Sequence, residues 1–270
     1  MATRTLFIEA LEKDSARVVE AVQAHSEPPT PAVPSCPGWN LTMLLTHLGS
    51  THRRATSRLR TPGETTPDPN DKSYLEVTPE WQEWLNTGKA PDDAAISPAL
   101  VAWFEEGSRE LAAALAATPD DAQVWNLSGR SKLPASFYQR QMSTETALHR
   151  WDAQNALPGH NPDPIDPELA YNALTLLFSF LPMRFKSFNG PDGQGETYHL
   201  HRTDGEGEWL LTFNGRELDV QPIHAKGDVA IRGTASDLLL VMWRRIPLDG
   251  LEIFGDKAKA QHLFELLPKM

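Results

Sequence analysis

The 270-residue chain has one cysteine, no long apolar run and no excess of positive charge. The single residue Cys36 excludes an internal disulfide framework and agrees with a reducing compartment. No apolar run approaches the length of a membrane span, and the first ten residues lack a basic start followed by an apolar signal core. We therefore expect a cytoplasmic protein with no membrane partner.

The charge balance is acidic, with 36 Asp and Glu residues against 25 Lys and Arg residues and a formal net charge of −11. Binding to a nucleic-acid backbone requires a concentrated basic face, so we expect no nucleic-acid partner. The chain is long for one compact domain, and two domains are the better expectation.

Apolar residues at helical spacing predict four long helices in the first half of the chain, over residues 6–24, from residue 40 onward, over 100–117 and over 136–156. Asn40 can cap the second helix, and Trp39 can pack back onto Leu44. Four such helices are typical of an up-and-down bundle, whose interior can hold a metal ion. Residues 61–97 are rich in Pro, Asp and Thr and predict a binding loop, a lid, a disordered segment or a flap over one edge of the core.

A Pro-rich linker at residues 159–166 separates this bundle from a different pattern. A helix over residues 168–188 precedes strands at 198–202, 208–213, 217–222 and 229–232, and a second helix follows at 236–243. The fold class predicted is α+β in two domains: a four-helix bundle at residues 1–160 and a small α+β domain at residues 161–270.

The fourth helix carries an unusual polar stripe. Glu145, His149 and Asp152 fall at i, i+4 and i+7, so all three point from nearly the same face. Burying any of these polar side chains without a partner would cost roughly several kcal/mol of free energy. A metal ion is one such partner. His47 lies on the apolar side of the second helix, and Arg54, seven residues on, shares its stripe, so we expect both to face inward.

His47, Glu145 and His149 form a set of two histidines and one carboxylate. Three protein ligands and an open fourth position are typical of catalytic zinc, but the same ligands suit Fe(II). Asp152 can be a fourth ligand, a base, a partner of Arg150, or an acceptor for the spare N–H of a ligand histidine.

Two other candidates have simpler interpretations. His199 and His201 alternate along one strand, but no carboxylate is evident on the same face, so we expect a solvated strand face. Cys36 is expected to be a small buried residue rather than a nucleophile.

Four segments together resemble the maleylpyruvate isomerase family of mycothiol-dependent enzymes. They are PSCPGWNLTMLLTH at residues 34–47, ETALHRWDA at 145–153, SDLLLVMWRR at 236–245 and LEIFGD at 251–256. The segment Glu-x-x-x-His-Arg-Trp-Asp is the most specific of these. The resemblance covers both halves of the chain in order.

This resemblance implies an N-terminal DinB-like bundle that binds a divalent metal, usually zinc, through His47, Glu145 and His149. It also implies a C-terminal domain similar to sterol-carrier proteins, with an Arg at the end of a Leu-rich helix that corresponds best to Arg245. Many members have Gly just before this Arg, where this chain has Arg244, so either guanidinium is a candidate to face the site.

The activity implied is that of a mycothiol-dependent isomerase or S-transferase. Metal-bound mycothiol thiolate would attack a small electrophilic substrate that bears a carboxylate. Addition to a conjugated double bond followed by thiol loss would give cis–trans isomerisation. Asp152 and Arg245 are the candidates for positioning substrate or thiol, and Arg54 and Arg244 for holding the cofactor. The alternatives are a non-catalytic protein that binds a small apolar ligand and an Fe(II) enzyme; the oligomeric state is not defined by the sequence, and a monomer is compatible with it.

Overall fold

The computed structural model describes residues 4–61, 63, 65–68 and 70–268. The chain forms two compact units, Met1–Asp163 and Pro164–Met270. The first is built mainly of helices and the second of a sheet with helices, so the predicted α+β class is confirmed.

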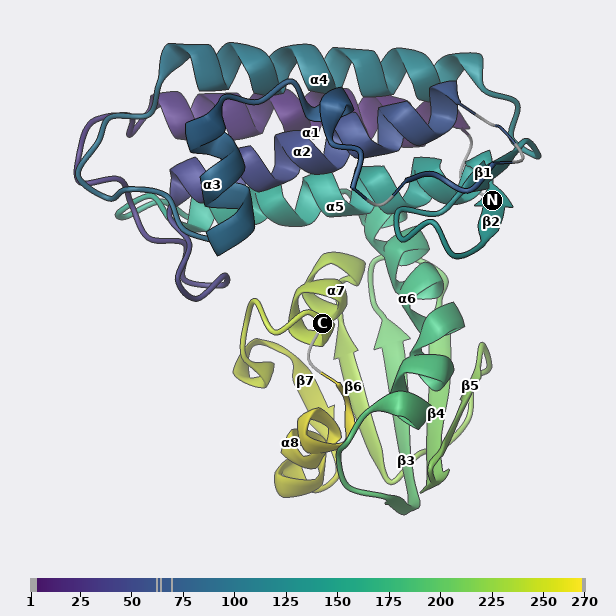
Figure 1. Ribbon diagram of the computed structural model, residues 1–270. Helices are drawn as coiled ribbons and strands as arrows, with labels where there is room; N and C mark the ends of the chain where they lie inside the picture. Colours follow the sequence, from purple (N-terminus) through teal and green to yellow (C-terminus); the bar gives the residue numbers. More distant parts are fainter. Residues whose placement is uncertain (1–3, 62, 64, 69, 269–270) are drawn as a thin grey trace. The chain divides into compact units, whose positions relative to one another are not determined.

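Four long helices lie side by side in the first unit (Figure 1): α1 (Arg4–Gln23), α2 (Leu41–Arg60), α4 (Pro98–Ala117) and α5 (Ala135–Asn155). The start of α1 meets the end of α4, where the Arg4 guanidinium donates to the carbonyls of Leu115 and Thr118. α2 and α5 are also antiparallel, because Leu48 shares a core cluster with Ala153 of α5, whereas Leu59, further along α2, shares one with the earlier Tyr138.

The helix directions do not simply alternate. α2 and α4 run the same way, since Arg53 contacts Glu106 and Arg60 contacts Glu110. The alternation expected of an up-and-down bundle is therefore interrupted between these two helices, and residues 61–97 form the long crossover that the parallel arrangement requires.

Local sequence explains where α2 begins and how closely it approaches α4. The Asn40 side chain accepts a hydrogen bond from the Met43 backbone N–H at 2.9 Å and so caps the helix. Gly49 lies against the Trp103 ring, and a Cβ atom at residue 49 would come within 2.2 Å of it. The absence of a side chain at Gly49 therefore allows the two helices to pack closely.

The crossover contains structure that its composition did not predict. It includes a 3-10 turn at Ser73–Leu75 and a helix, α3 (Pro79–Thr87), which Thr78 caps. Trp81 is buried, with its ring 5.7 Å from that of Trp103. The crossover is thus a flap that packs onto the helical core. A second local element, the hairpin of β1 (Gln123–Trp125) and β2 (Lys132–Pro134), lies between α4 and α5 and was not predicted.

The second unit contains a five-stranded sheet in the order β5-β4-β3-β6-β7. Only the β3–β6 pair is parallel. The strands are β3 (Gly193–Arg202), β4 (Glu208–Gly215), β5 (Glu217–Gln221), β6 (Val229–Gly233) and β7 (Glu252–Phe254), and the helices are α6 (Pro167–Ser187), α7 (Ala235–Met242) and α8 (Lys257–Leu266). The edge strand β7 and helix α8 were not predicted.

Strand alternation gives the sheet an apolar face and a polar face. Trp209 and Phe213 of β4 pack against Phe178 and Phe185 of α6, with ring centroids 5.2 Å apart in both pairs. The buried residues Tyr198 and Leu200 lie opposite Leu211 and Trp209 in the register and share that apolar face. Because side chains alternate, His199, His201 and Glu208 lie on the other face.

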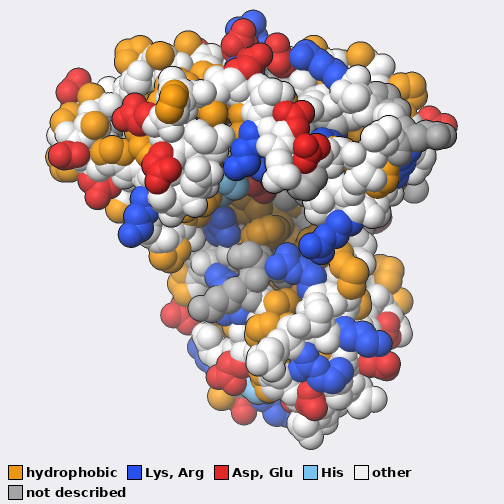
Figure 2. Space-filling view, in the orientation of Figure 1, with side chains coloured by type: hydrophobic (Ala, Val, Ile, Leu, Met, Phe, Trp, Pro, Cys, Tyr) orange, Lys and Arg blue, Asp and Glu red, His pale blue; other side chains and the backbone are white. Residues whose placement is uncertain are grey.

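Among the described residues, no helix is long and apolar enough to cross a membrane. Figure 2 shows Asp and Glu side chains spread among Lys and Arg side chains over the helical unit. This distribution agrees with the acidic net charge of −11.

Candidate metal centre

Two helices of the first unit bring the predicted ligands together. α2 supplies His47, and the facing α5 supplies Glu145 and His149 from successive turns. Glu145 and His149 are four residues apart, so both project toward α2 from one side of α5. One nitrogen or oxygen atom from each of the three side chains lies within 4.8 Å of the others.

The contacting atoms are those that a metal ion would use. His47 Nε2 lies 3.1 Å from Glu145 Oε1, and His149 Nε2 lies 3.5 Å from the same oxygen. Tetrahedral bonds of about 2.0–2.1 Å place neighbouring ligand atoms about 3.3 Å apart. The spacing of the Glu145 oxygen from both histidine nitrogens therefore matches that of ligand atoms around a small divalent ion.

Asp152 orients one of the histidines. His149 Nδ1 lies 3.0 Å from Asp152 Oδ2, while its Nε2 faces Glu145. Asp152 is fully buried and also accepts a hydrogen bond from Ser35 Oγ at 2.5 Å, with Cys36 Sγ 3.6 Å away. A carboxylate that accepts the Nδ1–H leaves the Nε2 lone pair of His149 free for a ligand, which is the usual arrangement behind a metal-binding histidine.

Burial and hydrogen bonding oppose each other at this cluster. Burial alone would raise the pKa of Glu145, but hydrogen bonds with His149 and His47 outweigh it and hold that pKa well below its usual range. Burial alone would lower the pKa of His149, but its contacts with Asp152, Cys36 and Glu145 raise it well above the usual value. The pocket thus favours a negatively charged Glu145 next to positive charge, which a bound cation would also supply.

The cluster is accessible on one side. The side chains of His47 and Glu145 are 30% and 27% exposed, whereas that of His149 is 9% exposed. The Trp39 ring lies 4.7 Å from the His47 ring and 6.0 Å from the His149 ring. A small molecule could therefore reach the cluster past His47 and Glu145, beside an aromatic surface.

Arg54 is less deeply buried than its position suggested. It is half-buried on α2, whereas the neighbouring His52 and Arg53 are buried in the bundle. Arg53 forms ion pairs with Glu76 and Glu106. The His47 side of α2 is the accessible side, so a residue that shares the stripe of His47 need not lie in the core.

The two arginines after α7 belong to the second unit and differ in their surroundings. Arg244 has a positive φ of 58° and donates to the carbonyls of Phe264 and Leu267. Arg245 donates to the carbonyl of Trp243, whose ring lies 5.6 Å from its guanidinium carbon.

Three contributors near the cluster were missed in the sequence. Ser35, Cys36 and Trp39 all come from the short segment that precedes α2. Cys36 was expected to be a small buried residue, but it is half-buried and lies beside the Asp152 carboxylate. The signal available was the position of PSCPGW directly before the helix that carries His47.

The expectation for the strand histidines was wrong. His199 is buried, and a carboxylate does lie on the same face: Glu208 of the adjacent strand contacts both His199 and His201. The carboxylate was overlooked because it comes from a neighbouring strand, whose register the sequence does not specify.

The fold and the cluster define a class: a two-unit α+β protein with a candidate metal centre in a helical bundle. Residues 8–154 match the family described as mycothiol maleylpyruvate isomerase N-terminal domain, and residues 169–262 match the corresponding C-terminal domain. The chain therefore belongs to the mycothiol maleylpyruvate isomerase family.

Solved structures show the same fold. A mycothiol-dependent maleylpyruvate isomerase is 18% identical to this chain, covers 93% of each chain and has a TM-score of 0.58. A mutant of a mycothiol-dependent maleylpyruvate isomerase is 17% identical, with the same coverage and TM-score. No curated protein gives a significant match to the chain.

Proposed function

We propose that this protein is a divalent-metal enzyme that uses mycothiol to isomerise, or to transfer the thiol to, a small electrophile that bears a carboxylate. Family membership supports the use of mycothiol. The observation that carries the proposal is the convergence of His47, Glu145 and His149 at 3.1–3.5 Å on an accessible side of the bundle.

The donor set fits zinc. Two imidazoles and one carboxylate leave the fourth tetrahedral position for an exogenous ligand, as in catalytic rather than structural zinc sites. An ion held there would lower the pKa of a bound thiol and favour the nucleophilic thiolate near neutral pH.

The chain's own residues have distinct roles in this proposal. Asp152 is a positioning residue: it accepts the Nδ1 proton of His149 and so fixes which ring nitrogen faces the cluster. Glu145 contributes the negative charge that binds the cation. Trp39 excludes water from one side of the two imidazoles.

A guanidinium group is suited to bind the substrate carboxylate, because it can donate two parallel hydrogen bonds to it. Arg244 is engaged with carbonyls of α8 and the residues after it, so a structural role accounts for it. We propose Arg245 for the substrate carboxylate, because it corresponds best to the Arg that the family carries at the end of this Leu-rich helix. Arg54, half-buried on the same stripe of α2 as His47, remains the candidate for contacting the thiol cofactor.

We further propose that the protein acts in the cytoplasm on small molecules. The single cysteine, which agrees with a reducing compartment, and the family's use of a small thiol support this proposal.

The test is a turnover assay with zinc-loaded protein, mycothiol and maleylpyruvate or a related conjugated acid. We expect isomerised product, or a thioether if the thiol is transferred, and a loss of at least about 100-fold in Glu145→Ala. Glu110→Ala, on the accessible side of α4, is the matched control and should retain wild-type turnover. Equal turnover of Glu145→Ala and wild type would refute the role of the metal centre, and turnover that requires iron and oxygen would favour an Fe(II) enzyme.

A further inference from the structure

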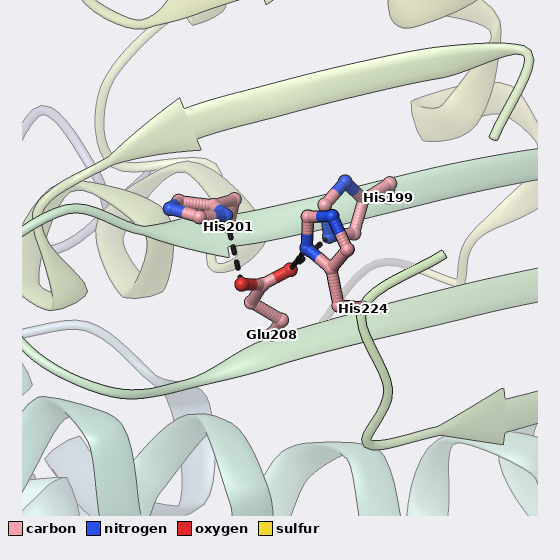
Figure 3. Close-up of side chains that lie close together, drawn as sticks. All are labelled: His199, His201, Glu208 and His224. Atoms are coloured by element: carbon pink, nitrogen blue, oxygen red, sulfur yellow. Dashed lines mark hydrogen bonds and ion pairs between the residues drawn. The ribbon is translucent and has the colours of Figure 1, made fainter. Parts of the chain in front are cut away.

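A second cluster of metal-binding side chains lies on the polar face of the sheet in the second unit. It consists of His199, His201, Glu208 and His224, and one nitrogen or oxygen atom of each lies within 4.8 Å of the others. Figure 3 shows the three imidazoles arranged around the Glu208 carboxylate. None of these residues belongs to the centre formed by α2 and α5.

The sheet register explains why these four side chains meet. His199 and His201 are two residues apart on β3 and therefore share a face. Glu208 of β4 is directly opposite His201, so its carboxylate can reach both histidines. β5 pairs with β4 as far as Leu210 and Gln221, where the strand ends, and the loop that follows brings His224 into contact with Glu208.

The contacts are short and involve every member. Glu208 Oε2 lies 2.7 Å from His199 Nε2 and 2.5 Å from His224 Nδ1, and Glu208 Oε1 lies 3.2 Å from His201 Nδ1. The three ring centroids are 5.4–6.5 Å apart. Ring nitrogens of all three histidines thus point toward one small volume, as metal coordination requires.

The low exposure of three of the four side chains supports a preformed binding site. The side chain of His199 is only 9% exposed although it lies on the polar face, and those of His201 and Glu208 are 25% and 23% exposed. His224, on the loop after β5, is 80% exposed. Three members are therefore held by the sheet, and the fourth belongs to a loop that can adjust its position.

We propose that His199, His201, Glu208 and His224 bind a divalent transition-metal ion, with Zn²⁺ as the expected occupant. Three imidazoles and one carboxylate suit Zn²⁺ better than Mg²⁺ or Ca²⁺, which prefer oxygen ligands. The ligand atoms need to separate to about 3.3 Å around a tetrahedral ion, which small side-chain rotations achieve for the contacts of 2.5 and 2.7 Å.

This second site differs in kind from the first. Four protein ligands close the coordination sphere, as in structural zinc sites, whereas the first centre has three. The bound ion would attach the 222–228 loop to β3 and β4 through His224. The proposal is independent of the mycothiol reaction and does not rest on the proposed function.

The test uses the full chain with the first centre removed by Glu145→Ala and His149→Ala. After chelator treatment, Zn²⁺ is titrated into the protein at pH 7.5 in competition with a chromophoric chelator. We expect one bound ion per chain. Adding Glu208→Gln or His224→Ala should weaken Zn²⁺ binding by at least about tenfold, since even an outer partner of a metal ligand contributes that much.

Two features keep the test decisive. His224→Ala changes an exposed loop side chain and should leave the sheet folded, which circular dichroism checks. His262→Ala, a half-buried histidine of α8 outside the cluster, is the matched control and should bind as the parent does. The proposal is overturned if the parent binds no ion, or if His262→Ala weakens binding as much as His224→Ala.

A second measurement tests the attachment of the loop. Lys226 is exposed and lies two residues after His224, so trypsin can cleave the loop there. Zn²⁺ should slow this cleavage severalfold in the parent but not in His224→Ala. Equal cleavage with and without Zn²⁺ in the parent would overturn the structural role of the ion.

Discussion

His52 is buried inside the helical bundle and should make the stability of that unit depend on pH. It is fully buried, with Nδ1 3.0 Å from Ser108 Oγ and Nε2 2.9 Å from Thr146 Oγ1. Burial lowers the pKa of His52 from 6.5 to about 3. The native protein therefore keeps this imidazole neutral in mild acid, whereas the unfolded chain protonates it.

The sign and size of the effect follow from this difference. Because the folded pKa is depressed, the stabilisation is fully present above pH 6.5 and is lost as the pH falls toward 3. Each pH unit within that window costs about 1.4 kcal/mol. Between pH 7 and pH 5, the free energy of unfolding should fall by about 2 kcal/mol from His52 alone.

Urea unfolding of chelator-treated protein at pH 7, 6 and 5, followed by tryptophan fluorescence, measures this loss. In His52→Gln the stability at pH 7 should be lower by about 1–3 kcal/mol, because a buried hydroxyl loses a partner, but the loss between pH 7 and pH 5 should shrink by about 2 kcal/mol. His25→Gln, at an exposed position shortly after the end of α1, is the control and should keep the wild-type pH dependence. The same pH dependence in wild type and His52→Gln would refute the reasoning.

Two further predictions concern the first unit. Asp152→Asn should weaken zinc binding at the His47 centre by about 10–100-fold, because the partner of His149 loses its charge. A competition titration measures this affinity, with Asp71→Asn, at an exposed position, as the control. An unchanged zinc affinity in Asp152→Asn would contradict the positioning role. Gly49→Ala should reduce the free energy of unfolding by about 1–3 kcal/mol, because a Cβ atom would lie 2.2 Å from the Trp103 ring. Gly107→Ala, whose Cβ would first meet the Arg53 side chain at a longer distance of 3.3 Å, should be milder in the same urea unfolding assay, and an equal effect would contradict the packing argument.

Much of the fold could be predicted from periodicity. The four long helices of the first unit, and most strands of the second, have strong apolar spacing and clear start signals such as Asn40. Helix α3 was missed because Pro, Asp and Thr dominate its surroundings, yet Trp81 packs it onto the core. The parallel direction of α2 and α4 could not be predicted, since it depends on the path of the crossover.

The candidate site was predictable where its residues share one helix. Glu145, His149 and Asp152 are related by helical spacing alone, and the structure brings His47 to them. The contacts of Ser35 and Cys36 with Asp152 depend on how an irregular segment folds back onto α5. In the second unit, His199 and His201 were visible as a pair, but Glu208 joins them only through the β3–β4 register.

The central claim is that the His47, Glu145 and His149 centre holds a metal ion whose open position accepts a thiol. The most direct measurement is the visible absorption spectrum of cobalt-substituted protein during titration with mycothiol, carried out in His224→Ala to limit cobalt binding at the second cluster. We predict a new thiolate-to-cobalt band that saturates at one thiol per chain and is absent in Glu145→Ala. A spectrum that does not change when mycothiol is added would contradict it.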